Sequence, residues 1–263
     1  FAIDNSDSSD ADDAISIEGN RIWIHIADVA NQVKIDSDLD IYAQKRASNL
    51  YLPDQIIHML PPEVSDMCSL GQSSQSSALS VSFNMVNSQI SDVKIAQSMI
   101  KVTKISYENA DKEVKENEVL SKLSVIAALH KAFRNDNGAI KLDLPNVDVK
   151  VKDNKVNIKV QVESASRELV AEMMVIAGRA VAKFANENKV SMPFLTQEVG
   201  SFSEETMNNK ENLTFSQAFQ ATRSFKRSKI STKPSLHAGL GLSSYVRVTS
   251  PIRRYLDLLV HQQ

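Results

Sequence analysis

Cysteine and glycine are scarce in this chain of 263 residues, and each scarcity excludes a class of protein. The single cysteine, Cys68, can form neither a disulfide within the chain nor a cysteine-based zinc cluster, which favours a reducing compartment such as the cytoplasm. The seven glycines form no G-x-G-x-x-G or G-x-x-x-x-G-K-[ST] pattern, so the dinucleotide and P-loop phosphate sites are excluded. The five histidines show no H-E-x-x-H spacing. The apolar stretches are short and interrupted by polar residues, which excludes a membrane span.

The composition is that of a folded protein, because 42% of the residues are hydrophobic and 24% are charged. We find no internal repeat and no linker-like stretch, and therefore predict one domain over residues 1–263. The chain begins with phenylalanine instead of methionine, so we interpret it as a domain excised from a longer protein.

The hydrophobic periodicity predicts strands in the first part of the chain and helices later. Alternation predicts strands over residues 14–18, 21–29, 79–86, 90–105 and 147–162, with a Gly19-Asn20 turn between the first two. Spacings of three and four predict helices over residues 38–49, 108–134, 168–188 and 214–229, and a last helix that begins at Ser250-Pro251. This arrangement predicts the α+β fold class.

The net charge of −2 conceals an uneven distribution of charge along the chain. Residues 1–13 contain five aspartates and no basic residue, whereas residues 212–256 contain eight basic residues and no acidic one. Two solvated charge runs would explain this pattern. The alternative is that one end of the chain binds cations and the other binds anions.

The acidic end holds four aspartates within ten residues, directly before a predicted strand: Asp4, Asp10, Asp12 and Asp13. Carboxylates forced together raise one another's pKa and destabilise the fold unless a hard cation such as Mg²⁺, Mn²⁺ or Ca²⁺ neutralises them. An EF-hand loop is excluded, because Ser9 and Ile15 stand where that loop needs glycine and glutamate. A solvated turn of aspartates and serines remains the simpler alternative.

The basic end contains the segment Thr249-Ser250-Pro251-Ile252-Arg253-Arg254-Tyr255. Serine followed by proline predicts the start of a helix, which places both arginines in the first turn. Positive side chains are disfavoured there, and a bound anion such as phosphate would resolve the conflict. Alternatively, the arginines turn away to surface carboxylates. A carboxylate cation site and an arginine phosphate site would together suit phosphodiester hydrolysis.

Six short segments follow one another along the chain: Ile3-Asp4 through Asp10-Ala11-Asp12-Asp13-Ala14, His25-Ile26-Ala27-Asp28-Val29, Tyr51-Leu52-Pro53, Met59-Leu60-Pro61, Cys68-Ser69-Leu70 and Thr249 to Tyr255. In sequence and in order they resemble the motifs of the catalytic (RNB) domain of the ribonuclease II and ribonuclease R family. The resemblance implies a 3′ to 5′ exoribonuclease that depends on Mg²⁺ and releases nucleoside 5′-monophosphates. The implied substrate is single-stranded RNA, threaded through a channel that admits no duplex.

The resemblance also implies a role for individual residues. The metal ligands would be Asp4, Asp10, Asp12 and Asp13, and the loss of Asp12 would abolish cleavage with the least effect on binding. Arg253 would contact the scissile phosphate, with Arg254 as the weaker candidate beside it. Three further RNA contacts are implied. Tyr51 would stack on the 3′-terminal base, Tyr107 would lie near the ribose, and Glu172 would recognise the 2′-OH.

The chain also departs from the family pattern. Leu195 stands where an arginine is frequent, and Gly178 where an asparagine is frequent. The cold-shock and S1 modules that usually flank this domain are absent from the chain, which predicts a weak affinity for RNA. Two alternatives stay open: a catalytically silent RNA-binding or scaffold domain with the same fold, and a metal nuclease that acts on DNA.

Overall fold

The computed structural model describes residues 1–6, 11–140, 144, 146–152, 155–160, 163–201 and 214–263. Its centre is a four-stranded antiparallel sheet in the order β2-β3-β6-β7. The strands are β2 (Asp13–Glu18), β3 (Arg21–Ala27), β6 (Ser76–Val86) and β7 (Gln89–Ile100). Gly19 adopts a positive φ of 59° in the turn between β2 and β3, as the Gly19-Asn20 turn predicts. The α+β class is confirmed.

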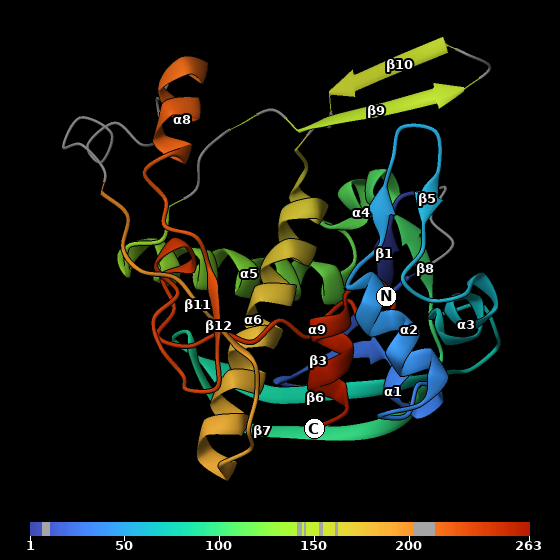
Figure 1. The fold of residues 1–263 in the computed structure, drawn as a ribbon. Helices are drawn as coiled ribbons and strands as arrows, with labels where there is room; N and C mark the ends of the chain where they lie inside the picture. Colours follow the sequence, from blue (N-terminus) through green and yellow to red (C-terminus); the bar gives the residue numbers. More distant parts are fainter. Residues whose placement is uncertain (7–10, 141–143, 145, 153–154, 161–162, 202–213) are drawn as a thin grey trace.

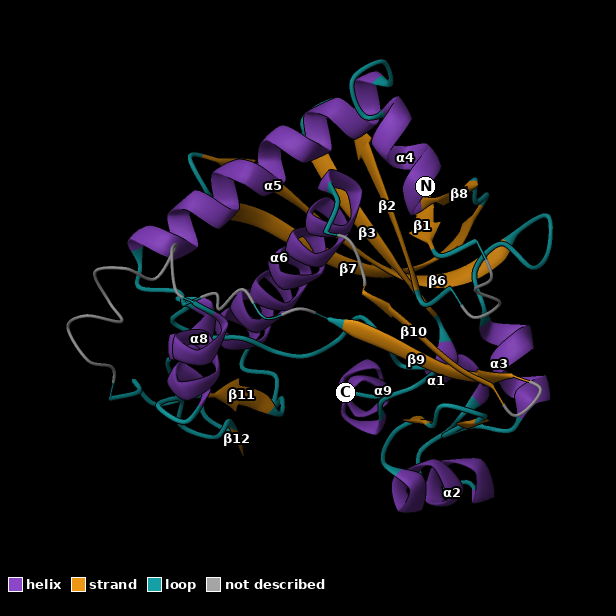
Figure 2. Cartoon of the chain, turned by 90° about the horizontal axis from the view of Figure 1, so that it is seen from above, coloured by secondary structure: helices purple, strands orange, loops and turns teal. Residues whose placement is uncertain are grey.

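Two long helices cover one face of this sheet (Figure 2). They are α5 (Glu118–Asp136) and α6 (Ala165–Asn188). Three alternate residues of β3 face the helices and are fully buried: Ile22, Ile24 and Ile26. They pack against residues of α6 that are spaced three and four apart: Met173, Ile176 and Ala180. Burying each large aliphatic side chain stabilises the fold by roughly 1.5–3 kcal/mol, so this contact forms the main core.

Shorter elements surround the sheet and the two helices. They are β1 (Ala2–Asp4), α1 (Val29–Gln32), α2 (Asp38–Arg46), β4 (Leu50–Tyr51), β5 (Ile56–Ile57), α3 (Pro62–Cys68), β8 (Lys104–Ser106), α4 (Tyr107–Glu113), β9 (Val147–Lys152), β10 (Lys155–Val160), β11 (Phe194–Thr196), α8 (Phe215–Thr222), β12 (Lys229–Ser231), η1 (Ala238–Leu240) and α9 (Tyr255–His261). The β9–β10 hairpin extends from the top of the molecule in Figure 1.

A second apolar cluster joins the two ends of the chain. It contains Ala2 and Ala11 from the N-terminal segment together with Ile252 and Leu258 from the C-terminal one. The C-terminal helix α9 packs against α1 and α2 (Figure 1). This cluster therefore places the aspartate-rich segment beside the segment that contains the arginines.

Several predicted elements end earlier than expected. The strand predicted over 21–29 stops at Ala27, because Val29 begins α1. The helix predicted over 108–134 is divided into α4 and α5, because the side chain of Asn117 accepts hydrogen bonds from the amides of Val119 and Leu120 and starts a new helix.

The last two helices also differ from the prediction. The helix expected over 214–229 ends at Thr222, and Lys229 already pairs with β11 as part of β12. The final helix begins at Tyr255 and not at Ser250-Pro251. The turn that takes its place forms part of the functional site described below.

Gly178 allows α6 to approach the strand-like segment that holds Tyr245 and Val246. A β-carbon at this position would overlap the ring of Tyr245 and the carbonyl oxygen of Val246. We expect Gly178→Ala to lower the melting temperature, because overpacking costs about 1–3 kcal/mol and exceeds the roughly 1 kcal/mol gained in helix propensity.

Thermal unfolding followed by circular dichroism checks this. The control is Ala171→Gly at an exposed position of the same helix, which loses only the propensity difference. A Gly178→Ala protein as stable as the original would show that the two segments do not pack this closely.

Candidate functional site

The N-terminal aspartates are held by pairing on two sides. Strand β1 pairs in parallel with β8, which sets Asp4 opposite Ser106. Phe1 and Ile15 exchange two main-chain hydrogen bonds of 2.8 Å, which hold β1 beside β2. Asp10, predicted as a metal ligand, lies outside the described residues.

Asp12 connects the two charged ends of the chain. Its side chain is buried; Oδ1 accepts the Ile252 amide at 3.1 Å and Oδ2 accepts Nε of Arg253 at 2.9 Å. Burial raises the pKa of Asp12 to about 7, although Arg253 and the Ile252 amide oppose the shift. Each oxygen keeps a second lone pair, so the predicted role of Asp12 as a metal ligand stays a prediction.

Asp13 occupies a different electrostatic environment. Its carboxylate makes no hydrogen bond or ion pair to another described residue. Burial raises its pKa to about 7, and the neighbouring charges of Asp12 and Asp4 add to this shift. At neutral pH such a carboxylate is a source of repulsion in the folded state.

This environment fits a hard divalent cation, because a positive ion would offset both the burial and the repulsion between carboxylates. Asp13 is the described carboxylate that fits it best, since the charges of Asp12 and Asp4 both disfavour its ionisation. No group of three or more potential metal ligands occurs in the part of the chain that the structure describes. A full set of ligands would therefore require Asp10, as the sequence predicts.

The arginine segment forms a turn, so the prediction that both arginines lie in the first turn of a helix is wrong. The carbonyl oxygen of Ser250 accepts the amides of Arg253 at 3.3 Å and Arg254 at 3.0 Å. Arg254 then forms an isolated bridge with Ser48 before α9 begins. The chain departs from a helix here because the Tyr255 amide donates to the carbonyl oxygen of Ala47 at 2.8 Å, and Arg254 before it is extended.

The two arginines of the turn have different partners. Arg253 donates to Asp12 and, through Nη2, to Oγ of Ser250 at 2.8 Å, while 39% of its side chain stays exposed. Arg254 donates to the buried carboxylate of Asp257 at 2.6 Å. Arg253 is thus the arginine beside the aspartates, and Arg254 is paired within its own segment.

Tyr51 lies beside Arg253. The Asn49 amide donates to the carbonyl oxygen of Arg253 at 3.0 Å, and two residues later Tyr51 interacts electrostatically with the guanidinium. The side chain is 55% exposed. A flat ring next to the site is therefore accessible, as stacking on a base would require.

Tyr107 is also brought to the aspartates. It begins α4, directly after β8, and burial together with the charges of Asp4 and Asp13 raises its pKa to about 12. The guanidinium of Arg167 lies 4.1 Å from the centre of its ring and donates to Asn5 at 2.6 Å. Sequence reasoning missed Arg167, because nothing in the pattern of α6 distinguishes it from a solvated arginine.

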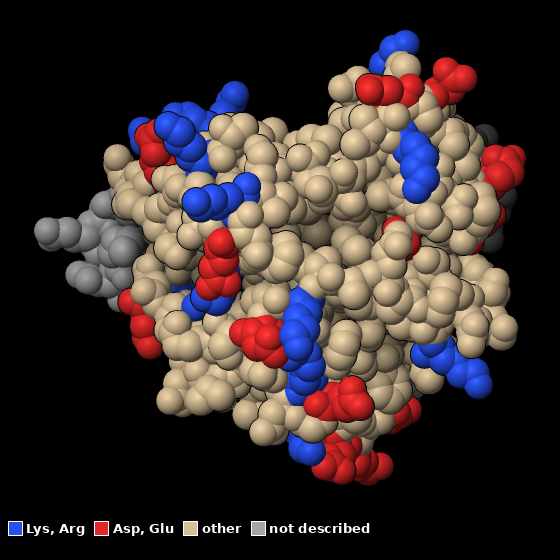
Figure 3. Space-filling model, turned by 90° about the horizontal axis from the view of Figure 1, so that it is seen from below, with Lys and Arg blue, Asp and Glu red and all other residues tan. Residues whose placement is uncertain are grey.

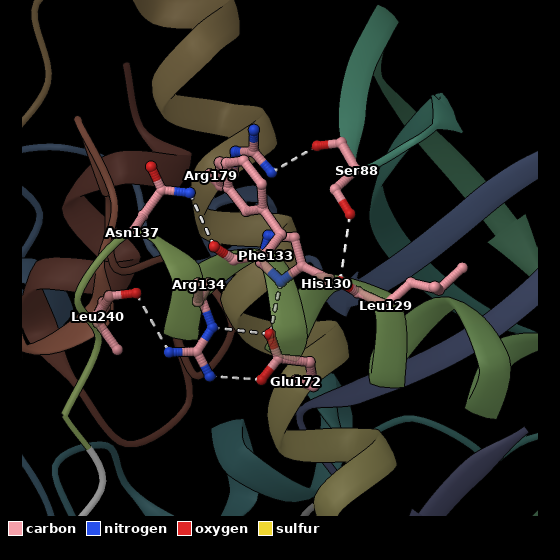
Figure 4. A network of polar contacts seen from close by, with 9 residues as sticks. All are labelled: Ser88, Leu129, His130, Phe133, Arg134, Asn137, Glu172, Arg179 and Leu240. Carbon is pink, nitrogen blue, oxygen red and sulfur yellow. Dashed lines mark hydrogen bonds and ion pairs between the residues drawn. The ribbon is translucent and has the colours of Figure 1, made fainter. Parts of the chain in front are cut away.

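Glu172 lies in a separate network between α5 and α6 (Figure 4). Its carboxylate accepts Nε and Nη2 of Arg134 at 2.8 and 2.5 Å and contacts Nδ1 of His130 at 2.5 Å. Against the effect of burial, Arg134 and His130 hold the pKa of Glu172 below its usual range. No contact among the described residues joins Glu172 to the aspartates, so its recognition of the 2′-OH stays a prediction, and its observed contacts are structural.

The sequence profile of the RNB domain matches residues 1–263 of the chain. The chain belongs to the RNB domain family. It is 36% identical over 281 residues to an uncharacterized ribonuclease of Synechocystis, a match that covers all of this chain and 41% of that protein. This RNB domain thus spans less than half the length of that relative.

Two solved structures share the fold of this RNB domain. Mycoplasma genitalium RNase R in complex with ribose methylated single-stranded RNA superposes with a TM-score of 0.88 at 23% identity, covering 99% of this chain and 48% of that one. Yeast Ssd1, a pseudonuclease, superposes with a TM-score of 0.79 at 19% identity, covering 100% of this chain and 38% of that one. At these identities the likeness establishes the fold alone.

One face of the RNB domain carries charges of both signs. On the face seen from below in Figure 3, acidic and basic side chains are interspersed. Within the described residues no helix is both long and apolar enough to cross a membrane. The acidic and basic ends of the chain meet at the contact between Asp12 and Arg253.

Proposed function

We propose that this RNB domain hydrolyses single-stranded RNA from its 3′ end and releases nucleoside 5′-monophosphates. The observation that carries the proposal is the contact between Asp12 and Arg253, residues 241 positions apart. It places a partly exposed guanidinium beside a cluster of carboxylates. Metal-assisted hydrolysis of a phosphodiester uses both: positive charge for the phosphoryl oxygens and carboxylates for a metal.

Asp4, Asp13 and Asp10 would hold a divalent cation, Mg²⁺ or Mn²⁺, which when bound activates water and neutralises phosphoryl charge. Arg253 would contact the scissile phosphate through Nη1, the guanidinium nitrogen that makes no hydrogen bond to a described residue. Asp12 would orient this guanidinium through Nε. A charged donor held in advance costs no reorganisation when negative charge develops on the phosphate.

The neighbouring tyrosines support a site for the end of an RNA strand. Tyr51, exposed beside Arg253, would stack on the 3′-terminal base, a contact that every base can make. Tyr107, near Asp4 and Asp13, would lie close to the ribose. Single-stranded RNA is the partner this arrangement fits. A cytoplasmic location and flanking cold-shock and S1 domains stay predictions.

The direct test is incubation with 5′-labelled single-stranded RNA. We expect a ladder of shortening labelled products with Mg²⁺ and none with EDTA, because both water activation and charge neutralisation depend on the metal. Equal degradation in EDTA would contradict the metal mechanism. A labelled DNA strand of the same sequence is the control, and its equal degradation would favour a nuclease acting on DNA.

A second candidate function is RNA binding without cleavage, favoured by the likeness to yeast Ssd1, a pseudonuclease. The same experiment separates the two. Retention of the labelled RNA in a mobility shift, with no shortened product at any Mg²⁺ or Mn²⁺ concentration, would support the silent domain. The presence of Asp4, Asp12 and Asp13 beside Arg253 favours cleavage.

A further inference from the structure

Asp257 is a completely buried aspartate in the first turn of α9. One of its oxygens, Oδ2, accepts two hydrogen bonds: from the Ser250 amide at 2.9 Å and from Nη2 of Arg254 at 2.6 Å. These donors are the first and last residues of the turn that replaces the expected helix. Asp257 therefore holds both ends of one turn with a single oxygen atom.

The middle of the same turn holds Asp12. The Ile252 amide and Nε of Arg253 donate to its two oxygens at 3.1 and 2.9 Å. Ser250 stabilises this arrangement, since its hydroxyl accepts Nη2 of Arg253 at 2.8 Å. The turn thus lies between two carboxylates. Arg254 pairs with Asp257 on one side, and Arg253 pairs with Asp12 on the other.

We propose that Asp257 is a positioning residue: by anchoring Ser250 and Arg254 it sets the turn so that the Ile252 amide and the Arg253 guanidinium face Asp12. The inference rests on the proposed function for its effect on catalysis. The proposed effect of Asp257 on the geometry of the turn does not depend on that function.

The two arginines are neighbours in the chain and both interact electrostatically with Asp12 and Asp13. Without Asp257, the Arg254 guanidinium would lose its buried anion, and the Asp12–Asp13 carboxylates would be the next anions available to it. Two guanidiniums would then compete for Asp12. Asp257 prevents this competition because it keeps Arg254 on the α9 side of the turn, at 2.6 Å from its own carboxylate.

The test is Asp257→Asn, measured in two ways. On single-stranded RNA with Mg²⁺ we expect kcat to fall by about 100-fold, the effect of displacing a reacting group by about 1 Å, with KM changed by less than about 3-fold. Hydrogen exchange at the Ile252 amide should become faster, because its bond to Asp12 loosens when the turn is released. Unchanged kcat together with unchanged protection of Ile252 would overturn the inference.

The matched control is Asp40→Asn. Asp40 is also a buried aspartate that contacts the C-terminal segment, since it accepts the hydroxyl of Tyr255 at 3.2 Å and the side-chain amide of Gln262 at 3.1 Å, but it makes no contact with the turn among the described residues. Asp40→Asn should lower the melting temperature and leave kcat and the Ile252 exchange rate unchanged. An equal fall of kcat in both variants would mean that Asp257 contributes stability alone.

A second variant keeps the test decisive if Asp257→Asn does not fold. Asp257→Glu retains the charge but displaces it by one methylene, so it should fold, cleave about 10-fold more slowly and show the same faster exchange at Ile252. If the original chain does not cleave RNA at all, the proposed function fails. The exchange rates of Ile252 then still decide whether Asp257 positions the turn.

Discussion

Asp13→Asn is expected to abolish RNA cleavage and, in the absence of divalent cations, to raise the melting temperature. Cleavage is lost because an amide is a poor ligand for a hard cation and leaves Asp4 with one fewer carboxylate partner. Stability rises because the substitution removes a half-buried negative charge that Asp12 and Asp4 repel. A gain in stability coupled to a loss of activity distinguishes a ligand from a structural residue.

The pH dependence of this effect follows from the pKa of Asp13, which is raised from 3.8 to about 7. Between these values the folded state binds the proton more tightly than the unfolded state does. The contribution of Asp13 to metal-free stability should therefore be most favourable below about pH 4 and decrease as the pH rises to about 7, by at most about 4 kcal/mol. In Asp13→Asn the decrease should be smaller by that amount, measured by urea unfolding from pH 4 to pH 8.

The control is Asp12→Asn, which is expected to lower the melting temperature of the metal-free protein. Asparagine can accept from the Ile252 amide or from Arg253 but not from both, so one buried donor is left without a partner at a cost of about 1–3 kcal/mol. If both substitutions stabilise the metal-free protein equally, Asp12 is an uncompensated charge like Asp13. If both destabilise it, the carboxylates do not converge on a cation site.

Arg253→Ala is expected to slow cleavage by roughly 100- to 1,000-fold while leaving the effect of Mg²⁺ on stability intact. Removing one preorganised charge stabiliser costs about 3 kcal/mol in the transition state. Mg²⁺ at about 100 times its Kd should still raise the free energy of unfolding by roughly 2.7 kcal/mol, because Arg253 contributes no ligand. Single-turnover kinetics and thermal unfolding with and without Mg²⁺ measure the two effects separately.

The matched control is Arg227→Ala, an exposed arginine of the basic segment that has no ion pair with a described residue. It should weaken RNA binding slightly, more at low salt, and leave the single-turnover rate unchanged. Loss of the Mg²⁺ effect in Arg253→Ala would show that this arginine is needed to hold the aspartates in place. It would then have to be assigned a structural role.

The sequence predicted the elements whose signals are local. The Gly19-Asn20 hairpin and the α6 helix are confirmed, because a turn dipeptide and a recurrence at three and four depend only on neighbouring residues. The family motifs predicted that the acidic and basic ends form one site. The hydrophobic periodicity alone could not predict that the two ends meet, since Asp12 and Arg253 are 241 positions apart.

The failures have a common physical origin in tertiary contacts. Ser250-Pro251 has the local signature of a helix start, but the carbonyl oxygen of Ala47 accepts the Tyr255 amide, and Arg254 is extended. The helix expected over residues 214–229 ends at Thr222, because Lys229 pairs with Thr196 of β11 instead. In each case a main-chain partner distant in sequence overrides the local pattern.

The contact between Asp12 and the turn at Ile252 and Arg253 has a consequence for biosynthesis. A ribosome makes the chain from the N-terminus, so the aspartates leave the exit tunnel long before Arg253 is translated. Until then, Asp12 lacks both of its partners in the turn, and the second apolar cluster lacks Ile252 and Leu258. A nascent chain that stops before Ile252 therefore carries the carboxylates without the guanidinium. The candidate site can therefore form only after Ile252 and Arg253 have been synthesised.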